Sequence, residues 1–140
     1  MTHHEVVAAL IVQTDRILLG QRSARRRLYP DVWDLFGGHV EPGEGQIETL
    51  VRELQEELDI TPTDWNFLET INISIPTSAN EPADQMTVHV YRVTAWTGMP
   101  VNRQPEEHSS IGWFTLEQAA TLQLADASYP VLFARYMRSP

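Results

Sequence analysis

The chain has 140 residues, 42% of them apolar, and its nineteen acidic residues outnumber the ten basic ones, all arginine, to give a formal charge of −9. This length suits a single domain over residues 1–140, the apolar content argues against disorder, and the absence of cysteine excludes disulfides, thiolate metal sites and cysteine nucleophiles. The acidic balance also argues against long nucleic acids as partners, because the surfaces that bind them are basic.

The N-terminal segment is typical of two short buried strands. The apolar run Val6–Val12 lacks helical spacing, a second run covers Ile17–Leu19, and Thr14-Asp15 between them suits a tight turn. We therefore expect a β-hairpin. The first run is far shorter than the roughly 20 residues of a membrane span, and residues 3–5 before it are not basic, as a signal peptide would require. These features favour a cytoplasmic protein without a membrane partner.

The next part of the chain changes from loop to helix. Residues 23–33 are polar, rich in arginine and contain Pro30, which indicates a loop. After Gly37-Gly38, residues 46–58 carry apolar side chains at helical spacing, which predicts an amphipathic helix. Its apolar stripe consists of Ile47, Leu50, Val51, Leu54 and Leu58.

The second half alternates between strands and connections. Apolar residues between 67 and 75 predict a strand that ends at Pro76, and the composition of 77–84 indicates a loop. Residues 86–96 are rich in Val, Thr, Tyr and Trp and predict a long strand. Residues 97–110 form the longest expected connection, and 111–114 form a last short strand.

Two helices are expected near the C-terminus. Thr115-x-x-Gln118 fits a capping box, in which the two side chains bind free backbone N–H groups at a helix start. A final helix is expected from about Tyr129 to Met137, with Pro130 in its first turn. Strands and helices interleave along the chain, so the fold class is α/β or α+β with a mixed sheet between helices.

The charged residues are unevenly placed along the sequence. Nine of the nineteen acids fall between residues 31 and 59, and four of the ten arginines lie just before them. A solvated surface usually mixes its charges more evenly, so this asymmetry indicates a site. The acids are Asp31, Asp34, Glu41, Glu44, Glu48, Glu53, Glu56, Glu57 and Asp59, and the arginines are Arg22, Arg25, Arg26 and Arg27.

Three of these acids share one side of the predicted helix. At about 100° per residue, Glu53, Glu56 and Glu57 occupy one arc of about 100° beside the apolar stripe. Like charges at this spacing repel, and Arg52 can partner only part of the cluster. Divalent cations held by carboxylate oxygens would compensate the charge. The alternative is an ordinary solvated helix face with weak ion pairs.

The loop before the helix favours a site, and the whole pattern resembles a known family. Gly37, Gly38 and Gly43 allow close approach of backbone to a ligand. The pattern Gly38-x5-Glu44-x7-Arg52-Glu53-Leu54-x-Glu56-Glu57-x-Asp59-Ile60 resembles the Nudix box of the Nudix hydrolases. The segment from Tyr29 to Glu41 resembles the usual entry to the box. The size of the chain is similar to that of the MutT-like members.

This resemblance implies an α/β/α sandwich with a mixed β-sheet and metal-dependent attack of water on a pyrophosphate linkage. It implies Mg²⁺ as the cofactor, with Mn²⁺ as a possible substitute. Glu56 and Glu57 would be metal ligands together with the Gly38 carbonyl. Glu53 would be a further ligand or the base that takes the proton of the water. Arg52 would orient Glu53 and Glu44 through charge-assisted hydrogen bonds, and Glu41 and Glu44 would support the box.

The flanking segments carry further expected site residues. Leu18-Leu19-x-x-Arg22 resembles a strand that supplies a phosphate-binding arginine, and Arg27 lies in the adjacent arginine run. Gly37 and Gly38 would contact the substrate through their backbone. The stretch that contains Glu106 and Glu107 resembles a loop with one more acid, which we assign to Glu106 as a metal ligand, with Glu107 as the alternative.

The sequence departs from the family pattern at three positions. Asp59 replaces the glycine that usually ends the catalytic helix in a left-handed conformation, at a penalty of about 1 kcal/mol. Phe36 stands where proline is common and Thr49 where alanine is common. Both are interpreted as packing variations.

The expected activity is hydrolysis of a small nucleoside diphosphate derivative. The leading hypothesis is a nucleoside triphosphate, oxidised or not, cleaved to monophosphate and pyrophosphate. ADP-ribose or another nucleoside diphosphate sugar is an alternative, because Pro76 stands at a distance from Ile60 similar to that subgroup. A non-catalytic nucleotide-sensing module is a second class, disfavoured because Glu53, Glu56 and Glu57 are retained. A homodimer is possible.

Overall fold

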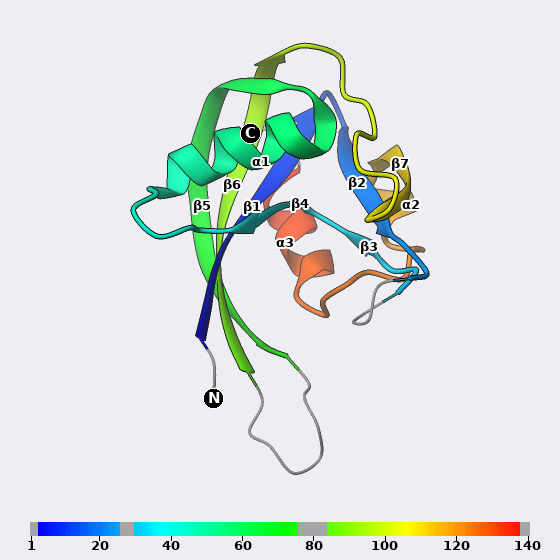
Figure 1. Ribbon diagram of the computed structural model, residues 1–140. Helices are drawn as coiled ribbons and strands as arrows, with labels where there is room; N and C mark the ends of the chain where they lie inside the picture. The colour runs from blue at the N-terminus through cyan, green and yellow to red at the C-terminus, as the bar shows by residue number, and fades with distance from the viewer. Residues whose placement is uncertain (1–2, 26–29, 76–83, 138–140) are drawn as a thin grey trace.

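A computed structural model describes residues 3–25, 30–75 and 84–137. In these ranges a mixed sheet lies between helices, with strand order β3-β2-β1-β6-β5, β4 paired with β1 and β7 paired with β2 (Figure 1). The strands are β1 (His3–Gln13), β2 (Arg16–Arg22), β3 (Trp33–Asp34), β4 (Phe36–His39), β5 (Thr61–Ile75), β6 (Asp84–Thr97) and β7 (His108–Thr115). The helices are α1 (Gln46–Leu58), α2 (Leu116–Ala119) and α3 (Tyr129–Tyr136). This arrangement confirms the α/β class and the α/β/α sandwich.

Strand β1 lies in the middle of the sheet, and its residues 7–12 are buried on both faces. It pairs in parallel with β6 and antiparallel with β2 and β4. Val7, Ala9 and Ile11 belong to the apolar cluster under α1, whereas the alternate residues 8, 10 and 12 belong to the cluster under α3. A strand buried on both faces reads as a continuous apolar run, which explains the uninterrupted run in the sequence. The predicted hairpin with β2 is confirmed.

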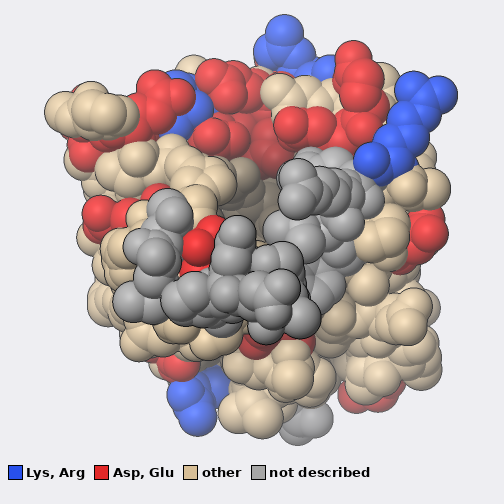
Figure 2. Space-filling model, turned by 60° about the horizontal axis from the view of Figure 1, so that its bottom comes forward, with Lys and Arg blue, Asp and Glu red and all other residues tan. Residues whose placement is uncertain are grey.

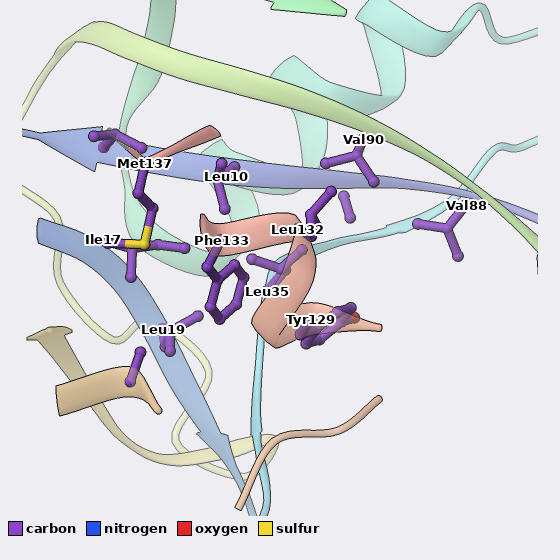
Figure 3. Packing of buried hydrophobic residues seen from close by; sticks show 13 residues of the cluster. Leu10, Ile17, Leu19, Leu35, Val88, Val90, Tyr129, Leu132, Phe133 and Met137 are labelled. Carbon is purple, nitrogen blue, oxygen red and sulfur yellow. The ribbon is translucent and has the colours of Figure 1, made fainter. Parts of the chain in front are cut away.

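The two larger helices cover opposite faces of the sheet (Figure 1). Leu50, Leu54 and Leu58 of α1 are fully buried, as their spacing predicted. Leu132 and Phe133 of α3 pack against side chains of β1, β2 and β6 on the other face, as Figure 3 shows. None of the helices within the described ranges is long and apolar enough to cross a bilayer.

Several boundaries differ from those that the sequence predicts. Strand β5 begins at Thr61 rather than near 67, because it pairs with the whole length of β6 and its bulges interrupt the alternation that marks a strand. Strand β7 begins at His108 rather than 111, which shortens the preceding connection. Residues 76–83, most of the expected loop 77–84, lie outside the described residues.

The helix ends follow local chemistry. The α2 capping box is confirmed, since the Thr115 hydroxyl accepts a bond from the Gln118 N–H and the Gln118 amide oxygen accepts one from the Thr115 N–H. Pro130 lies in the first turn of α3. Asp59 ends α1 with φ 59° and ψ 38°. This aspartate therefore adopts the left-handed conformation that glycine usually adopts at the end of a helix.

Candidate active site

The three glutamates of α1 are divided between a pocket and the outer surface. Glu53 and Glu57 line a pocket of about 410 Å³, and their side chains are 15% and 6% exposed. Glu56 is not a lining residue, and its side chain is 48% exposed. The predicted arc is therefore only partly turned into the pocket, with Glu56 at its open edge.

Two glycines of β4 allow close packing, Gly37 against β1 and Gly38 against α1. A Cβ atom on Gly37, whose φ is +151°, would meet the carbonyl oxygen of Val7 at 2.0 Å. A Cβ atom on Gly38 would meet the carboxylate of Glu53 at 2.3 Å. Side chains at either position would displace β1 or the glutamate, so both glycines are required by contact as well as by conformation.

Glu57 is a nearly buried acid held by the backbone of β4. Its Oε1 accepts a hydrogen bond of 2.9 Å from the N–H of Gly37. Burial, and secondly the neighbouring carboxylate of Glu53, raise the pKa of Glu57 well above its usual range. In the absence of a cation the ionised form is therefore disfavoured, and a bound cation would favour it.

Arg52 joins the loop before α1 to the acids of the helix. Its Nε and Nη2 bind both oxygens of Glu44 at 2.7 and 2.9 Å, and its Nη1 donates to Oε1 of Glu53 at 2.9 Å. Nη1 also lies 3.4 Å from Glu56, and Nη2 donates to the His39 carbonyl. These are the contacts with Glu44 and Glu53 that the sequence predicted.

Glu44 holds the guanidinium group of Arg52 in position. Its Oε1 accepts bonds from the Thr49 hydroxyl at 2.7 Å and from the Glu41 N–H at 3.1 Å. The hydrogen bonds from Arg52 and then Thr49 lower the pKa of Glu44 to about 2. Thr49, interpreted from the sequence as a packing variation, thus supplies a hydrogen bond that alanine would not.

Glu53 lines the pocket, and one of its two carboxylate oxygens is held by Arg52. Burial raises the pKa of Glu53, although the hydrogen bond from Arg52 opposes the shift. The carboxylates of Glu56 and Glu107 add to the increase. Because Arg52 binds Oε1, Oε2 is the atom left for an ion, water or substrate.

The further acid that the sequence predicted in the loop before β7 corresponds to Glu107, which lies beside α1. Ligand atoms of Glu57, Glu107 and His108 all lie within 4.8 Å of one another, and both Glu107 and His108 line the pocket. Glu106, to which the sequence assigned the metal-ligand role, is neither a member of this group nor a lining residue. The structure therefore favours the alternative, Glu107.

Backbone contacts with the C-terminal end of α1 place Glu107 there. The N–H groups of Val101 and Arg103 donate to the carbonyls of Leu58 and Glu57, both at 3.0 Å. The carbonyl of Glu107 in turn accepts a bond of 2.8 Å from the Ser23 N–H. The segment between β6 and β7 is thus tied to the helix that carries the other acids.

The remaining walls of the pocket are mostly apolar, with a small polar group. Arg22, the only arginine among the described lining residues, lies 3.5 Å from Asp34, whose Oδ1 accepts a 2.8 Å bond from the Tyr129 hydroxyl. Arg27 lies outside the described residues. The apolar lining includes Val6, Ala8, Leu35, Met86 and Val88.

Several polar lining residues have no site role in the sequence prediction, among them Asp34, His108 and Tyr129. Asp34 belongs to the clustered acids, but the sequence pattern gives it no role, and it gives none to Tyr129 or His108. Tyr129 is brought to the pocket by the packing of α3, and His108 by the pairing of β7 with β2. Neither the packing of α3 nor the pairing of β7 with β2 is indicated by a local sequence pattern. Figure 2 shows many acidic side chains along the upper edge of the molecule, beside a hollow, with others scattered over the rest of this face.

Comparisons with known proteins agree with this geometry. The model of the NUDIX domain family matches residues 2–135. The chain is 35% identical to the CTP pyrophosphohydrolase of Escherichia coli K12, covering 93% of this chain and 89% of that protein. It is 31% identical to the nucleoside triphosphatase NudI of Enterobacter sp. 638, covering 91% and 93%.

Solved structures show the same fold. The MutT Nudix hydrolase of Burkholderia pseudomallei has a TM-score of 0.75 at 30% identity, covering 84% of this chain and 87% of that one. The E. coli ORF135 protein has a TM-score of 0.72 at 33% identity, covering 99% and 94%. The chain therefore belongs to the Nudix hydrolase family, among its MutT-like members.

Proposed function

We propose that this Nudix pyrophosphohydrolase cleaves nucleoside triphosphates to nucleoside monophosphate and pyrophosphate, with Mg²⁺ as its metal. The observation that carries this proposal is the convergence of Glu53, Glu57 and Glu107 on one pocket that also has apolar walls. The acids suit a metal-bound polyphosphate, and the apolar walls suit a nucleoside. Relatives named as a CTP pyrophosphohydrolase and a nucleoside triphosphatase support this choice of substrate class.

The donor set fits hard divalent cations. Carboxylate oxygens are the ligands that Mg²⁺ prefers, and the nearly buried carboxylate of Glu57 needs a compensating positive charge. Glu53, Glu57 and Glu107 would hold the ions with the Gly38 carbonyl, and Glu56 would join from the open edge of the pocket. Bound ions of this kind neutralise phosphate oxygens and lower the pKa of a coordinated water.

Backbone and side-chain groups of the protein would hold the acids in place before substrate arrives. The Gly37 N–H fixes Oε1 of Glu57 and leaves Oε2 toward the pocket. Arg52, itself fixed by Glu44, holds Glu53 with Oε2 available to bind an ion or to accept a proton from the attacking water. Preorganised charges of this kind cost no rearrangement during the reaction.

Arg22 would meet phosphate charge, with its neighbour Asp34 to orient it. The guanidinium lies 3.5 Å from Asp34, which the Tyr129 hydroxyl holds from the opposite side. A guanidinium group matches phosphate oxygens with a planar fork of N–H donors. The position of Arg22 on the pocket wall supports the role in substrate binding that the sequence indicated.

The test is product analysis with a panel of substrates. The protein is incubated with Mg²⁺ and ordinary or oxidised nucleoside triphosphates, ADP-ribose or dinucleoside polyphosphates, and the products are separated by ion-exchange chromatography. Monophosphate and pyrophosphate are expected from triphosphates, with at least about a hundredfold loss of kcat in Glu57→Gln. Glu48→Gln is the matched control, because Glu48 lies on the same helix and only caps its first turn.

Three results would contradict the proposal in different ways. Faster turnover of ADP-ribose, to AMP and ribose 5-phosphate, would assign the alternative substrate class. Nucleotide binding without turnover of any substrate would indicate a sensing module. Equal activity of Glu57→Gln and the parent would place the chemistry elsewhere.

A further inference from the structure

His108 is a buried imidazole that faces the acids of the active site. The residue is 5% exposed, and its Nε2 lies 3.8 Å from Oε2 of Glu57. This separation is longer than a direct hydrogen bond, which would be about 2.7–3.2 Å. Two ligands bound to one ion at about 2.1 Å each lie about 3 to 4.2 Å apart, depending on their angle. The observed separation falls within that range.

A β-bulge turns His108 toward this site. Strands β2 and β7 pair in regular register from Arg16 to Gln21, which faces Ser110, but Arg22 faces His108, so Ser109 is the extra residue. Regular alternation would put Ser109, not His108, on the face that carries Ile111 and α1. The bulge exchanges the two, and bulges commonly re-aim a side chain in this way.

The ring of His108 is held in place from two sides. It packs against the ring of Phe36 with centroids 5.0 Å apart. A Cβ atom on Gly20 would meet Cδ2 of His108 at 2.7 Å and the ring of Phe36 at 2.8 Å, so this glycine makes room for both rings. Phe36, one of the departures from the family pattern, thus forms part of the support of the imidazole.

We propose that Nε2 of His108 binds a divalent ion together with Glu57 and Glu107, and that this nitrogen makes the ion site select Mn²⁺ over Mg²⁺. Magnesium prefers oxygen ligands, whereas imidazole nitrogen suits first-row transition ions. A site of two carboxylates and one imidazole therefore binds Mn²⁺ more tightly than an all-oxygen site of equal charge. This inference rests on the metal site of the proposed function, which Mg²⁺ can also occupy, and concerns which of the two ions that site binds more tightly at equal concentration.

The direct test is electron spin-echo spectroscopy of Mn²⁺ bound to the whole protein without nucleotide. Coordination by His108 gives a nitrogen coupling that changes when the protein is labelled with ¹⁵N-histidine. Because this comparison uses the unchanged chain, it does not depend on the folding of any variant. His108→Gln should remove the coupling, and His89→Gln, a histidine bound to Glu5 at 3.0 Å in another part of the sheet, should keep it.

Affinities of the two ions provide the second measurement. Calorimetric titration should show that His108→Gln weakens Mn²⁺ binding by at least about tenfold and changes Mg²⁺ binding by less than about twofold. Glu107→Gln replaces a charged carboxylate with a neutral amide and should weaken the binding of both ions alike. The ratio of the two affinities thus separates loss of a nitrogen ligand from general damage to the site.

The outcomes distinguish this inference from the proposed function. Mn²⁺ binding that depends on Glu57 but shows no histidine coupling would overturn the role of His108 and leave the carboxylate site intact. An equal loss of both ions in His108→Gln would also overturn it, since the imidazole would then only support the structure. Ion binding unaffected by Glu57→Gln would overturn the metal site itself.

Discussion

The N–H of Gly37 donates a hydrogen bond of 2.9 Å to Oε1 of Glu57, which joins β4 to the last turn of the helix that carries the acids. This bond fixes a carboxylate that is almost excluded from water. The neighbouring Gly38 leaves room for the Glu53 carboxylate, which a Cβ atom at that position would meet at 2.3 Å. The backbone of β4 therefore sets the positions of two acids of the site.

Gly38→Ala should inactivate the enzyme with only moderate loss of stability. The added methyl would overlap the Glu53 carboxylate, and a displacement of about 1 Å at a reacting group can cost about a hundredfold in rate. We expect kcat to fall by about that factor. Gly43→Ala is the control, because its φ of +79° predicts a loss of stability whereas its Cβ would meet nothing within 4 Å. Comparable loss of kcat in both variants would contradict the prediction.

The stability that Glu44 contributes should disappear in acid. The hydrogen bond from Arg52 lowers the pKa of Glu44 in the folded protein to about 2, below the ordinary value of 4.5. A lowered pKa means that the ionised form stabilises the fold above pH 4.5 and that this contribution is lost as the pH falls toward 2. The difference in Tm between wild type and Glu44→Gln should therefore shrink over that interval. A difference that stays constant would contradict the assignment.

Asp59→Gly should stabilise the protein. Asp59 has φ 59°, which costs about 1 kcal/mol relative to glycine. Its ion pair with Arg103 is 3.5 Å long between exposed side chains, and such pairs contribute little. We expect a rise of about 0.5–1 kcal/mol in the free energy of unfolding, measured in urea. Asp59→Ala should lower the same quantity, and a loss of stability in both variants would show that the side-chain contacts of Asp59 dominate.

Divalent ions should stabilise the folded protein only when Glu57 is present. An ion that binds the folded state alone adds about 2.7 kcal/mol at a hundred times its Kd. Glu57→Gln should abolish this increment while leaving the metal-free protein at least as stable as wild type at neutral pH. The reason is that glutamine can still accept the Gly37 hydrogen bond without placing a charge in a buried position. Thermal unfolding with and without Mg²⁺ measures both effects, and an unchanged increment would contradict the prediction.

Local patterns were sufficient for much of this protein. Helical spacing predicted α1 with its bounds, the capping box predicted the start of α2, and the order of elements predicted the mixed sheet. The contacts of Arg52 with Glu44 and Glu53 were also predictable, because they join residues of the same helix and of the loop just before it. In each case the determining interactions lie close together in sequence.

The uneven distribution of acids thus predicted a site, whereas only the tertiary structure decided which acids face it. Packing of α1 against β4 turns Glu53 and Glu57 inward and leaves Glu56 at the edge. Pairing of β7 with β2, together with its bulge, selects Glu107 and brings in His108. These choices depend on contacts between residues of different elements, from the bond between Gly37 and Glu57, 20 positions apart, to the pairing of Arg22 with His108. They also depend on a one-residue change of register, for which a linear pattern carries no signal.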